Sequence, residues 1–418
     1  MPVPFDSGRY LFVVTSMFAS ITIPVTGGAA EWTFEPAVKL RREYNDNIRL
    51  TAQPHNSVNG SIIAPSLNFG VNTPVWQTSG GGEVTQRRYS GEEGLDRDDN
   101  LLRISSTYRA ERSTWRLDAS RVRDSVLTDE YVSADTGVVQ TNKKRESDSV
   151  QPSWIWMLSE RTQLQLAYQQ ADVSYDDALS VGLYDYRNRS TTATLANQIS
   201  GLNQIFITAG YSAFDVAVTG FDSSTRNLQA GITRTFSETT RGTLQAGLRR
   251  TDSFTPGGNP IYTRFSTEFG DVLVQTGVTQ DVHSQETGSV FSGNLETKYE
   301  STRLSMALSR SLNPSGSGGQ VEQDTFTIDL NRQVTARLTA YVTANASKVR
   351  TDEGNISSNE RTYYEIRPGA HWRWSREWNV GMNYRYAYVK REFESEAADS
   401  NSVSLMLTYQ PLKMSISR

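Results

Sequence analysis

Two short acidic motifs contain the residue types that can activate a water molecule. Asp96 and Asp98 are two residues apart, and so are Asp281 and His283. A histidine held by a carboxylate acts as a general base when its partner lies within hydrogen-bond reach. Both motifs lie at expected loop ends, so this chemistry requires a fold that brings the two loops together. A surface hydrolase that uses His283 is therefore one hypothesis.

Other kinds of catalytic or metal site find little support in the sequence. The chain has three histidines, His55, His283 and His371, which lie far apart, and it has no cysteine. This argues against metal sites, thiolate chemistry and disulfides. The run from Asp96 resembles the start of a calcium loop, but Leu101 stands where that turn needs glycine. No Gly-x-Ser-x-Gly element is present for a serine nucleophile. We expect no metal and no cofactor.

A larger set of charged residues alternates with apolar residues along the chain. If these segments are strands, the charged set shares one face and is a candidate pore lining. Rings of charge set the ion selectivity of a pore, and arginine also pairs with the carboxylates of acidic sugars. The excess of arginine suggests a weak preference for anions or acidic glycans. The alternative is that these charges only pair with one another. The set comprises Arg103, Arg116, Asp118, Arg249, Glu268, Glu296, Lys298, Arg303, Asp329, Arg367, His371, Arg373 and Arg385.

The segment from Tyr364 to Tyr388 shows most clearly which elements would position these charges. Large apolar residues occupy its even positions and polar residues its odd positions, which predicts two β-strands joined by a turn at Ser375–Glu377. Ten strand residues tilted by about 45° span roughly 23 Å, about the height of the apolar band of an outer-membrane barrel. Aromatic residues lie at both edges of that span and predict two membrane girdles. One would comprise Trp372, Trp374 and Trp378, and the other Tyr364, Tyr386 and Tyr388.

The same alternation continues along the whole chain, and short and long connections follow each other in turn. This is the pattern of an outer-membrane barrel, with short periplasmic turns and longer extracellular loops. Counting the segments predicts an all-β, single, transmembrane, antiparallel up-and-down barrel of about 20 strands (18–20). A barrel this wide cannot fill its interior with side chains, so the polar face should line a wet lumen. The segments Gln77–Tyr89 and Tyr262–Phe269 are the weakest of the predicted strands.

Composition is consistent with a barrel and excludes other classes. Hydrophobic residues make up 37% of the 418 residues, and the mean hydropathy is -0.52. A helical membrane protein needs runs of about 20 apolar residues, whereas a barrel strand needs an apolar residue only at every second position. The formal net charge is -4, without a basic block. Nucleic acid is therefore not an expected partner.

The first 30 residues have the pattern of a secretory signal peptide. Arg9 precedes a largely apolar stretch from Tyr10 to Val25, and small residues lead to Ala30. We expect cleavage after Ala30, leaving residues 31–418 as the barrel, with no second domain and no helix of useful length. Within the barrel, Pro368 lacks the N–H that a strand ladder uses, so we expect a bulge or a local break in pairing there.

Two short segments resemble a known family. The segment from Trp32 ends in Tyr44-x-Asp46-Asn47-Ile48, and the closing strand Val403–Tyr409 is followed by Pro411. Both resemble Gram-negative outer-membrane β-barrel porins associated with exopolysaccharide and exosortase (PEP-CTERM) gene clusters. The resemblance implies an outer-membrane channel with a part in exopolysaccharide export. It also implies outer-membrane lipid and lipopolysaccharide as neighbours, and polysaccharide and periplasmic export components as partners.

Two alternatives remain beside the channel. One is a non-conducting structural barrel of a polysaccharide system, closed by inward-folded loops such as residues 125–145. The other is a surface protease, because the Asp96/Asp98 and Asp281/His283 spacings resemble those of the omptin family. Omptins have about half of the strands predicted for this chain, which weakens that alternative. Monomer and trimer are both compatible with the sequence.

Overall fold

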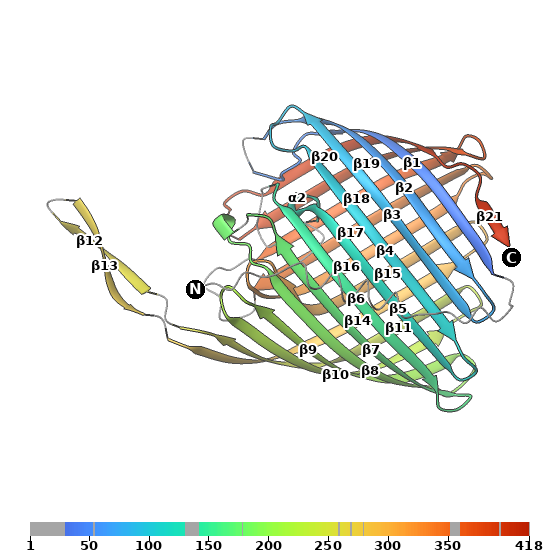
Figure 1. The fold of residues 1–418 in the computed structure, drawn as a ribbon, viewed down its shortest axis with the longest axis horizontal. Coiled ribbons are helices and arrows are strands. Elements are labelled where there is room, and N and C mark those ends of the chain that lie inside the picture. Colours follow the sequence, from blue (N-terminus) through green and yellow to red (C-terminus); the bar gives the residue numbers. More distant parts are fainter. Residues whose placement is uncertain are drawn as a thin grey trace.

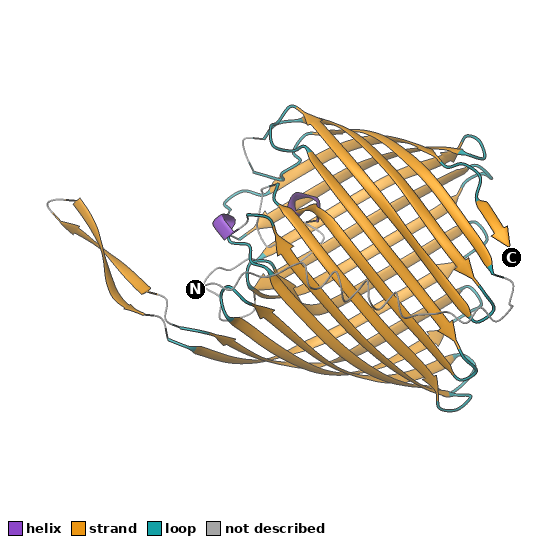
Figure 2. Ribbon diagram, in the orientation of Figure 1, coloured by secondary structure: helices purple, strands orange, loops and turns teal. Residues whose placement is uncertain are grey.

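The computed structural model describes residues 30–52, 55–129, 142–177, 179–257, 260–267, 270–278, 280–351, 360–392 and 394–417. The predicted signal peptide lies outside these residues, apart from Ala30. Strands form nearly all of the described chain, and the helical elements are one short turn at α2 and one at η1 (Figure 2). No helix among the described residues is long and apolar enough to cross a membrane.

Apart from β12 and β13, the strands run in chain order around one sheet (Figure 1). Their bounds are β1 Glu31–Asn45, β2 Val58–Asn72, β3 Trp76–Ser90, β4 Arg97–Arg109, β5 Ser113–Ser125, β6 Lys144–Met157, β7 Thr162–Tyr175, β8 Tyr186–Gln198, β9 Asn203–Val216, β10 Phe221–Thr235, β11 Thr240–Thr255, β12 Pro260–Thr267, β13 Gly270–Val278, β14 Val282–Lys298, β15 Thr302–Ser315, β16 Gly319–Gln333, β17 Leu338–Thr351, β18 Arg361–Arg373, β19 Trp378–Arg391, β20 Ala398–Tyr409 and β21 Met414–Ser417. The helical elements are α2 Val126–Asp129 and η1 Leu179–Val181.

The sheet closes on itself because β1 pairs with strands from both ends of the chain. On one side β1 pairs with β2 over its whole length. On the other side it pairs with β20, from Val38 opposite Tyr409 to Asn45 opposite Ser402. The short strand β21 continues this side of β1, from Phe34 opposite Met414 to Glu31 opposite Ser417. The result is a closed antiparallel up-and-down barrel of 18 strands with one extra strand.

The predicted count of about 20 strands is close but includes two strands that lie outside the barrel. β12 and β13 pair only with each other in a separate two-stranded sheet. They project away from the barrel beyond the ends of β11 and β14, which pair directly with one another (Figure 1). The predicted strand Tyr262–Phe269 is therefore wrong as a barrel strand. A hairpin has the same local pattern inside and outside a barrel, which explains the error.

All connections at one end of the barrel are short turns, and we call this the short-turn end. The other end, which we call the long-loop end, carries the longer connections together with two short turns, at residues 217–220 between β9 and β10 and at residues 316–318 between β15 and β16. Several short turns begin with a serine or threonine whose side-chain oxygen accepts a hydrogen bond from the N–H three residues later, a local motif that stabilises tight turns. The N–H groups of Thr162, Asn203 and Leu338 donate in this way at 3.0, 3.1 and 3.0 Å. Because these motifs are local, the positions of the short turns could be predicted from the sequence.

Three prolines interrupt the strand ladder without shifting its register. Pairing of β18 with β19 stops at Ile366 opposite Tyr386 and resumes at Gly369 opposite Asn383. Pro368 lies in this gap, while its pairing with β17 is continuous. The predicted local break is confirmed, and the alternative of a bulge is wrong. Gaps of the same kind occur at Pro65 and Pro152. A proline has no N–H to donate, so pairing is lost only locally.

The two faces of the wall differ in chemistry. On the concave side, side chains from non-neighbouring strands come within reach, as Lys39 of β1 and Glu83 of β3 do at 2.7 Å. The residues that alternate with Lys39 are Val38 and Leu40, and both are exposed on the outward face. Exposed apolar residues continue around the barrel, and Leu248 is 66% exposed. The outward face is therefore apolar and the inward face polar.

The closed ladder predicts resistance to detergent. Unheated protein should migrate faster than boiled protein in an SDS gel, because the intact barrel stays compact until heat breaks its backbone hydrogen bonds. The far-UV circular dichroism spectrum of the unheated sample should be of the β type. Identical migration before and after boiling, or a helical spectrum, would contradict the closed barrel.

Candidate functional site: the lumen

The candidate pore-lining residues alternate with outward-facing apolar residues on their strands, which places them on the inward face. Arg116 and Asp118, for example, flank the outward-facing Leu117 on β5. Whether they contact a passing solute stays a prediction, and the candidate Glu268 lies outside the described residues. The structure thus places the following on inward positions: Arg103, Arg116, Asp118, Arg249, Glu296, Lys298, Arg303, Asp329, Arg367, His371, Arg373 and Arg385.

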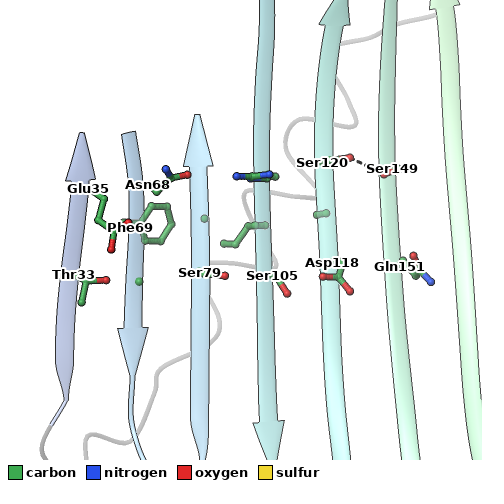
Figure 3. A pocket seen from close by; sticks show the side chains of 15 residues that line it. Thr33, Glu35, Asn68, Phe69, Ser79, Ser105, Asp118, Ser120, Ser149 and Gln151 are labelled. Carbon is green, nitrogen blue, oxygen red and sulfur yellow. Dashed lines mark hydrogen bonds between the residues drawn. The ribbon is translucent and has the colours of Figure 1, made fainter. Parts of the chain in front are cut away.

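A polar cavity lies along the inner wall of β1 to β6. It has a volume of about 540 Å³. Figure 3 shows side chains that line it from successive strands, including Glu35, Asp118 and Gln151. Arg103 also lines this cavity. Arg103 has no ion-pair partner within the described part of the chain. The cavity therefore presents hydroxyls, amides and charges of both signs.

Four of the other candidate cations share two carboxylates. Glu296 lies 2.9 Å from Lys298 and 3.6 Å from Arg303. Glu365, which the sequence analysis did not single out, lies 2.7 Å from both Arg367 and Arg385. Each of these two groups holds two cations around one carboxylate, so each retains one positive charge.

Three further groups of candidates are either paired one to one or in contact with an uncharged side chain. Arg116 and Asp118 form a 1:1 pair at 2.6 Å. The hydroxyl of Thr343 donates to Asp329 at 3.0 Å. The imidazole of His371 stacks on the ring of Tyr341, with 4.9 Å between centroids. The expected self-pairing of the charges is thus present, and it leaves the two groups around Glu296 and Glu365 positive.

Arg249 is the most deeply buried of the candidates. Its side chain is 1% exposed and lies 3.1 Å from Glu286 and 3.4 Å from Glu322. Glu286 belongs to β14, the neighbour of β11, but Glu322 belongs to β16. The contact with Glu322 therefore joins two parts of the wall that are not adjacent in the sheet.

This contact exists because the tip of the β15–β16 hairpin turns inward at the long-loop end. Pairing of β14 with β15 ends at Phe291 opposite Arg310, although both strands continue beyond it. Past that point the outward face of β16 meets the inward face of β10, where the hydroxyl of Ser223 donates to Gln320 at 2.8 Å. At the tip, the N–H of Tyr184 donates to the carbonyl of Gly316 at 2.8 Å. The hairpin therefore reaches across the long-loop end to the connection between β7 and β8.

Apolar side chains also gather on the inward face at the long-loop end. The largest cluster includes Tyr186 and Phe214, whose ring centroids are 5.4 Å apart, and Val126 from α2. A second cluster lies beneath β18 to β20 and includes Tyr363 and Val389. These inward apolar residues were not predicted from the sequence. The sequence does contain a signal for them. Near the long-loop ends of these strands, apolar residues occupy inward positions that would carry polar residues in a water-filled lumen.

The two motifs of the hydrolase hypothesis do not form one site. Asp96 accepts a hydrogen bond from the N–H of Tyr89 beside β4. Asp281 accepts one from the N–H of Gly257, and the ring of His283 lies against Phe254 of β11. Each motif is held by its own neighbouring segment, and no hydrogen bond or ion pair among the described residues joins the two. Among the described residues no group of three acidic or histidine side chains is arranged to hold a metal ion.

The predicted girdle residues lie near the two ends of the hairpin β18–β19. Trp372 and Trp374 are 46% and 58% exposed near the short-turn end, where Trp378 packs against Tyr409 at 4.8 Å between ring centroids. Tyr364 and Tyr388 lie opposite each other toward the long-loop end, 6.0 Å apart, and Tyr386 lies opposite Ile366. Their contact with a membrane interface stays a prediction.

Comparisons with known proteins give distant likenesses. No protein-family model matches the chain, and no curated protein matches it. OccAB2 of Acinetobacter baumannii is 11% identical, with a TM-score of 0.43 over 92% of this chain and 98% of its own. OccK8 (OprE) of Pseudomonas aeruginosa is 10% identical, with a TM-score of 0.44 over 92% and 98%. The siderophore receptor PiuA from Acinetobacter baumannii is 8% identical, with a TM-score of 0.45 over 91% and 82%. Likenesses at this level do not bear on the function, which is inferred below from the geometry of the chain itself.

Replacing the buried guanidinium should destabilise the barrel. Arg249→Met removes the cation that Glu286 and Glu322 share. Because Glu286 is 34% exposed and Glu322 keeps Arg350 at 3.1 Å, we expect a loss of about 2 kcal/mol, as for a hydrogen bond to a charged group. Urea unfolding in detergent, followed by tryptophan fluorescence, measures this loss. The control is Arg303→Met, because that side chain is 59% exposed and should change the unfolding free energy by less than about 1 kcal/mol. Equal effects of the two changes would contradict the buried role of Arg249.

Proposed function

We propose that this chain forms a water-filled channel in the outer membrane of a Gram-negative cell. The observation that carries the proposal is the contrast between the two faces of a closed 18-stranded wall. Apolar side chains such as Leu228 and Leu248 are exposed on the outward face, and hydroxyls, amides and charges line the inside. A soluble barrel would have the reverse arrangement, and at this strand number the interior is too wide for side chains to fill.

The two ends of the barrel give its proposed orientation. In outer-membrane barrels the short turns face the periplasm and the longer loops face outward. The short-turn end, which includes the β18–β19 turn and its tryptophans, would thus lie at the periplasmic interface. The long-loop end, with the inward-turned β15–β16 hairpin, would face the medium and contact lipopolysaccharide. The proposal assigns no catalytic role to the chain.

The proposed solutes are anions, and more specifically the acidic sugars of an exopolysaccharide delivered by periplasmic export components. The support is the positive charge left on the groups around Glu296 and Glu365, together with Arg103 in the polar cavity. Guanidinium groups form paired hydrogen bonds to carboxylates. Hydroxyl and amide side chains in the same cavity can bind sugar hydroxyls.

The charge balance of the lumen predicts weak anion selectivity. In planar bilayers under a KCl gradient, the reversal potential should have the sign of a chloride-preferring pore. The double variant Lys298→Gln and Arg303→Gln removes the two cations that pair with Glu296 and should shift the reversal potential toward cation preference. The matched control is Arg226→Gln with Arg250→Gln, because this pair makes the same charge change on the outward face.

The same bilayers test the class of solute. An acidic oligosaccharide should block the current more strongly than a neutral one of equal length, and the block should weaken in the lumen double variant. Cation preference of the natural protein would contradict the proposed charge role. Equal block by both sugars would contradict the acidic-glycan part alone.

The non-conducting barrel remains a second candidate because of the apolar clusters and the inward-turned hairpin at the long-loop end. Tyr186→Ser with Phe214→Ser should loosen the largest cluster and increase single-channel conductance. The control is Phe326→Ser on the outward face, which should leave conductance unchanged. If neither the natural protein nor the cluster variant conducts while both keep the heat-dependent gel shift, the structural role replaces the channel.

A further inference from the structure

We propose that the outward face of β16 to β19 is a binding site for one phosphate-bearing lipid of the extracellular leaflet. Its acyl chain would occupy an apolar groove, and its phosphate would lie at Lys348 and Lys390. This inference rests on the proposed membrane location of the barrel. It concerns the outer surface, whereas the proposed channel concerns the lumen.

The groove is a hollow of about 210 Å³ with an almost entirely apolar lining. Ala344 and Ala346 of β17 form its floor. Phe326 of β16 rises on one side. Tyr364 and Ile366 of β18 rise on the other side, and Tyr386 of β19 lies beside them. An apolar hollow lined by aromatic and aliphatic side chains has the chemistry of an acyl-chain site.

A cationic row lies directly beyond the groove toward the long-loop end. Lys348 is the next outward residue after Ala346, and two strand residues span roughly 7 Å. In the sheet Lys348 lies opposite Thr362, and Thr362 lies opposite Lys390. Two ammonium groups and a hydroxyl therefore share one level across three strands. All three can donate hydrogen bonds to the oxygens of one phosphate.

Neighbouring carboxylates leave these lysines available. Asp324 lies opposite Lys348, but its oxygens are held by Arg310 at 2.6 Å and by Arg350 at 3.1 Å. Asp399 lies opposite Tyr388, one outward position below Lys390. Within the described ranges, Lys348 and Lys390 have no ion-pair partner, and both are exposed. The two ammonium groups at this level are complementary to an anionic headgroup, while the carboxylates of Glu360 and Glu392 lie two residues away in the chain from Thr362 and Lys390.

The occupant is a lipid whose phosphate is attached close to its acyl chains, as in the lipid A part of lipopolysaccharide. A free phosphate would use only the lysines, and a neutral lipid would use only the groove. The geometry combines both, because the groove ends where the cationic row begins. A phosphorylated lipid should therefore bind more tightly than either part alone.

The test is lipid binding by the full-length protein in detergent, measured by native mass spectrometry with bisphosphorylated lipid A as the probe. Lys348→Gln with Lys390→Gln should weaken binding about tenfold, because two charge-assisted hydrogen bonds are lost. Ala346→Leu should weaken it by filling the groove floor. The matched controls are Arg226→Gln with Arg250→Gln for charge and Ala246→Leu for volume, both on outward positions of β10 and β11.

Three outcomes would overturn the inference. They are unchanged binding in the lysine variant, equal binding of a phosphate-free lipid A, and complete competition by inorganic phosphate. Single-channel conductance and the heat-dependent gel shift of the lysine variant should match those of the natural protein. If the natural protein fails to enter bilayers, the proposed channel fails. If it enters and conducts but does not bind lipid A selectively, only the lipid site fails.

Discussion

The structure depends on one constraint, which is that backbone N–H and C=O groups must find partners within the sheet. In a lipid environment an unpaired backbone group costs several kcal/mol, so a sheet with free edges is not stable there. The pairing of β1 with both β2 and β20 removes those edges. Once the sheet is closed, strand alternation determines which side chains face outward and which face the lumen.

Much of this could be predicted from the sequence because the decisive signals are local. Alternation along Tyr364–Tyr388 predicts both strands, and the serine at position 375 marks the turn between them, where the N–H of Trp378 donates to its hydroxyl. The inward placement of Arg116 and Asp118 follows from the same period of two. A pattern of this kind needs no knowledge of distant parts of the chain.

The wrong and missing predictions concern features that depend on contacts between residues far apart in the sequence. A hairpin such as β12–β13 has the same alternation as a barrel hairpin, so its exclusion could not be seen locally. The contact of Arg249 with Glu322 joins β11 to β16 and depends on the inward turn of a hairpin. The apolar cluster around Phe214 forms because segments from several connections meet at one end of the barrel. Contacts between residues so far apart in the sequence cannot be predicted from any short segment.

The strand β21 has a consequence for the order in which the barrel forms. Pairing of β20 with β1 stops at Val38, and β21 completes the edge of β1 down to Glu31. Glu31 and Ser417 are almost as far apart in the chain as any two described residues, and closing so long a loop is slow. Both flanks of β1 can be complete only after β21 has been synthesised and delivered. Completion of this barrel therefore depends on β21, and a chain without β21 would retain an exposed edge on β1.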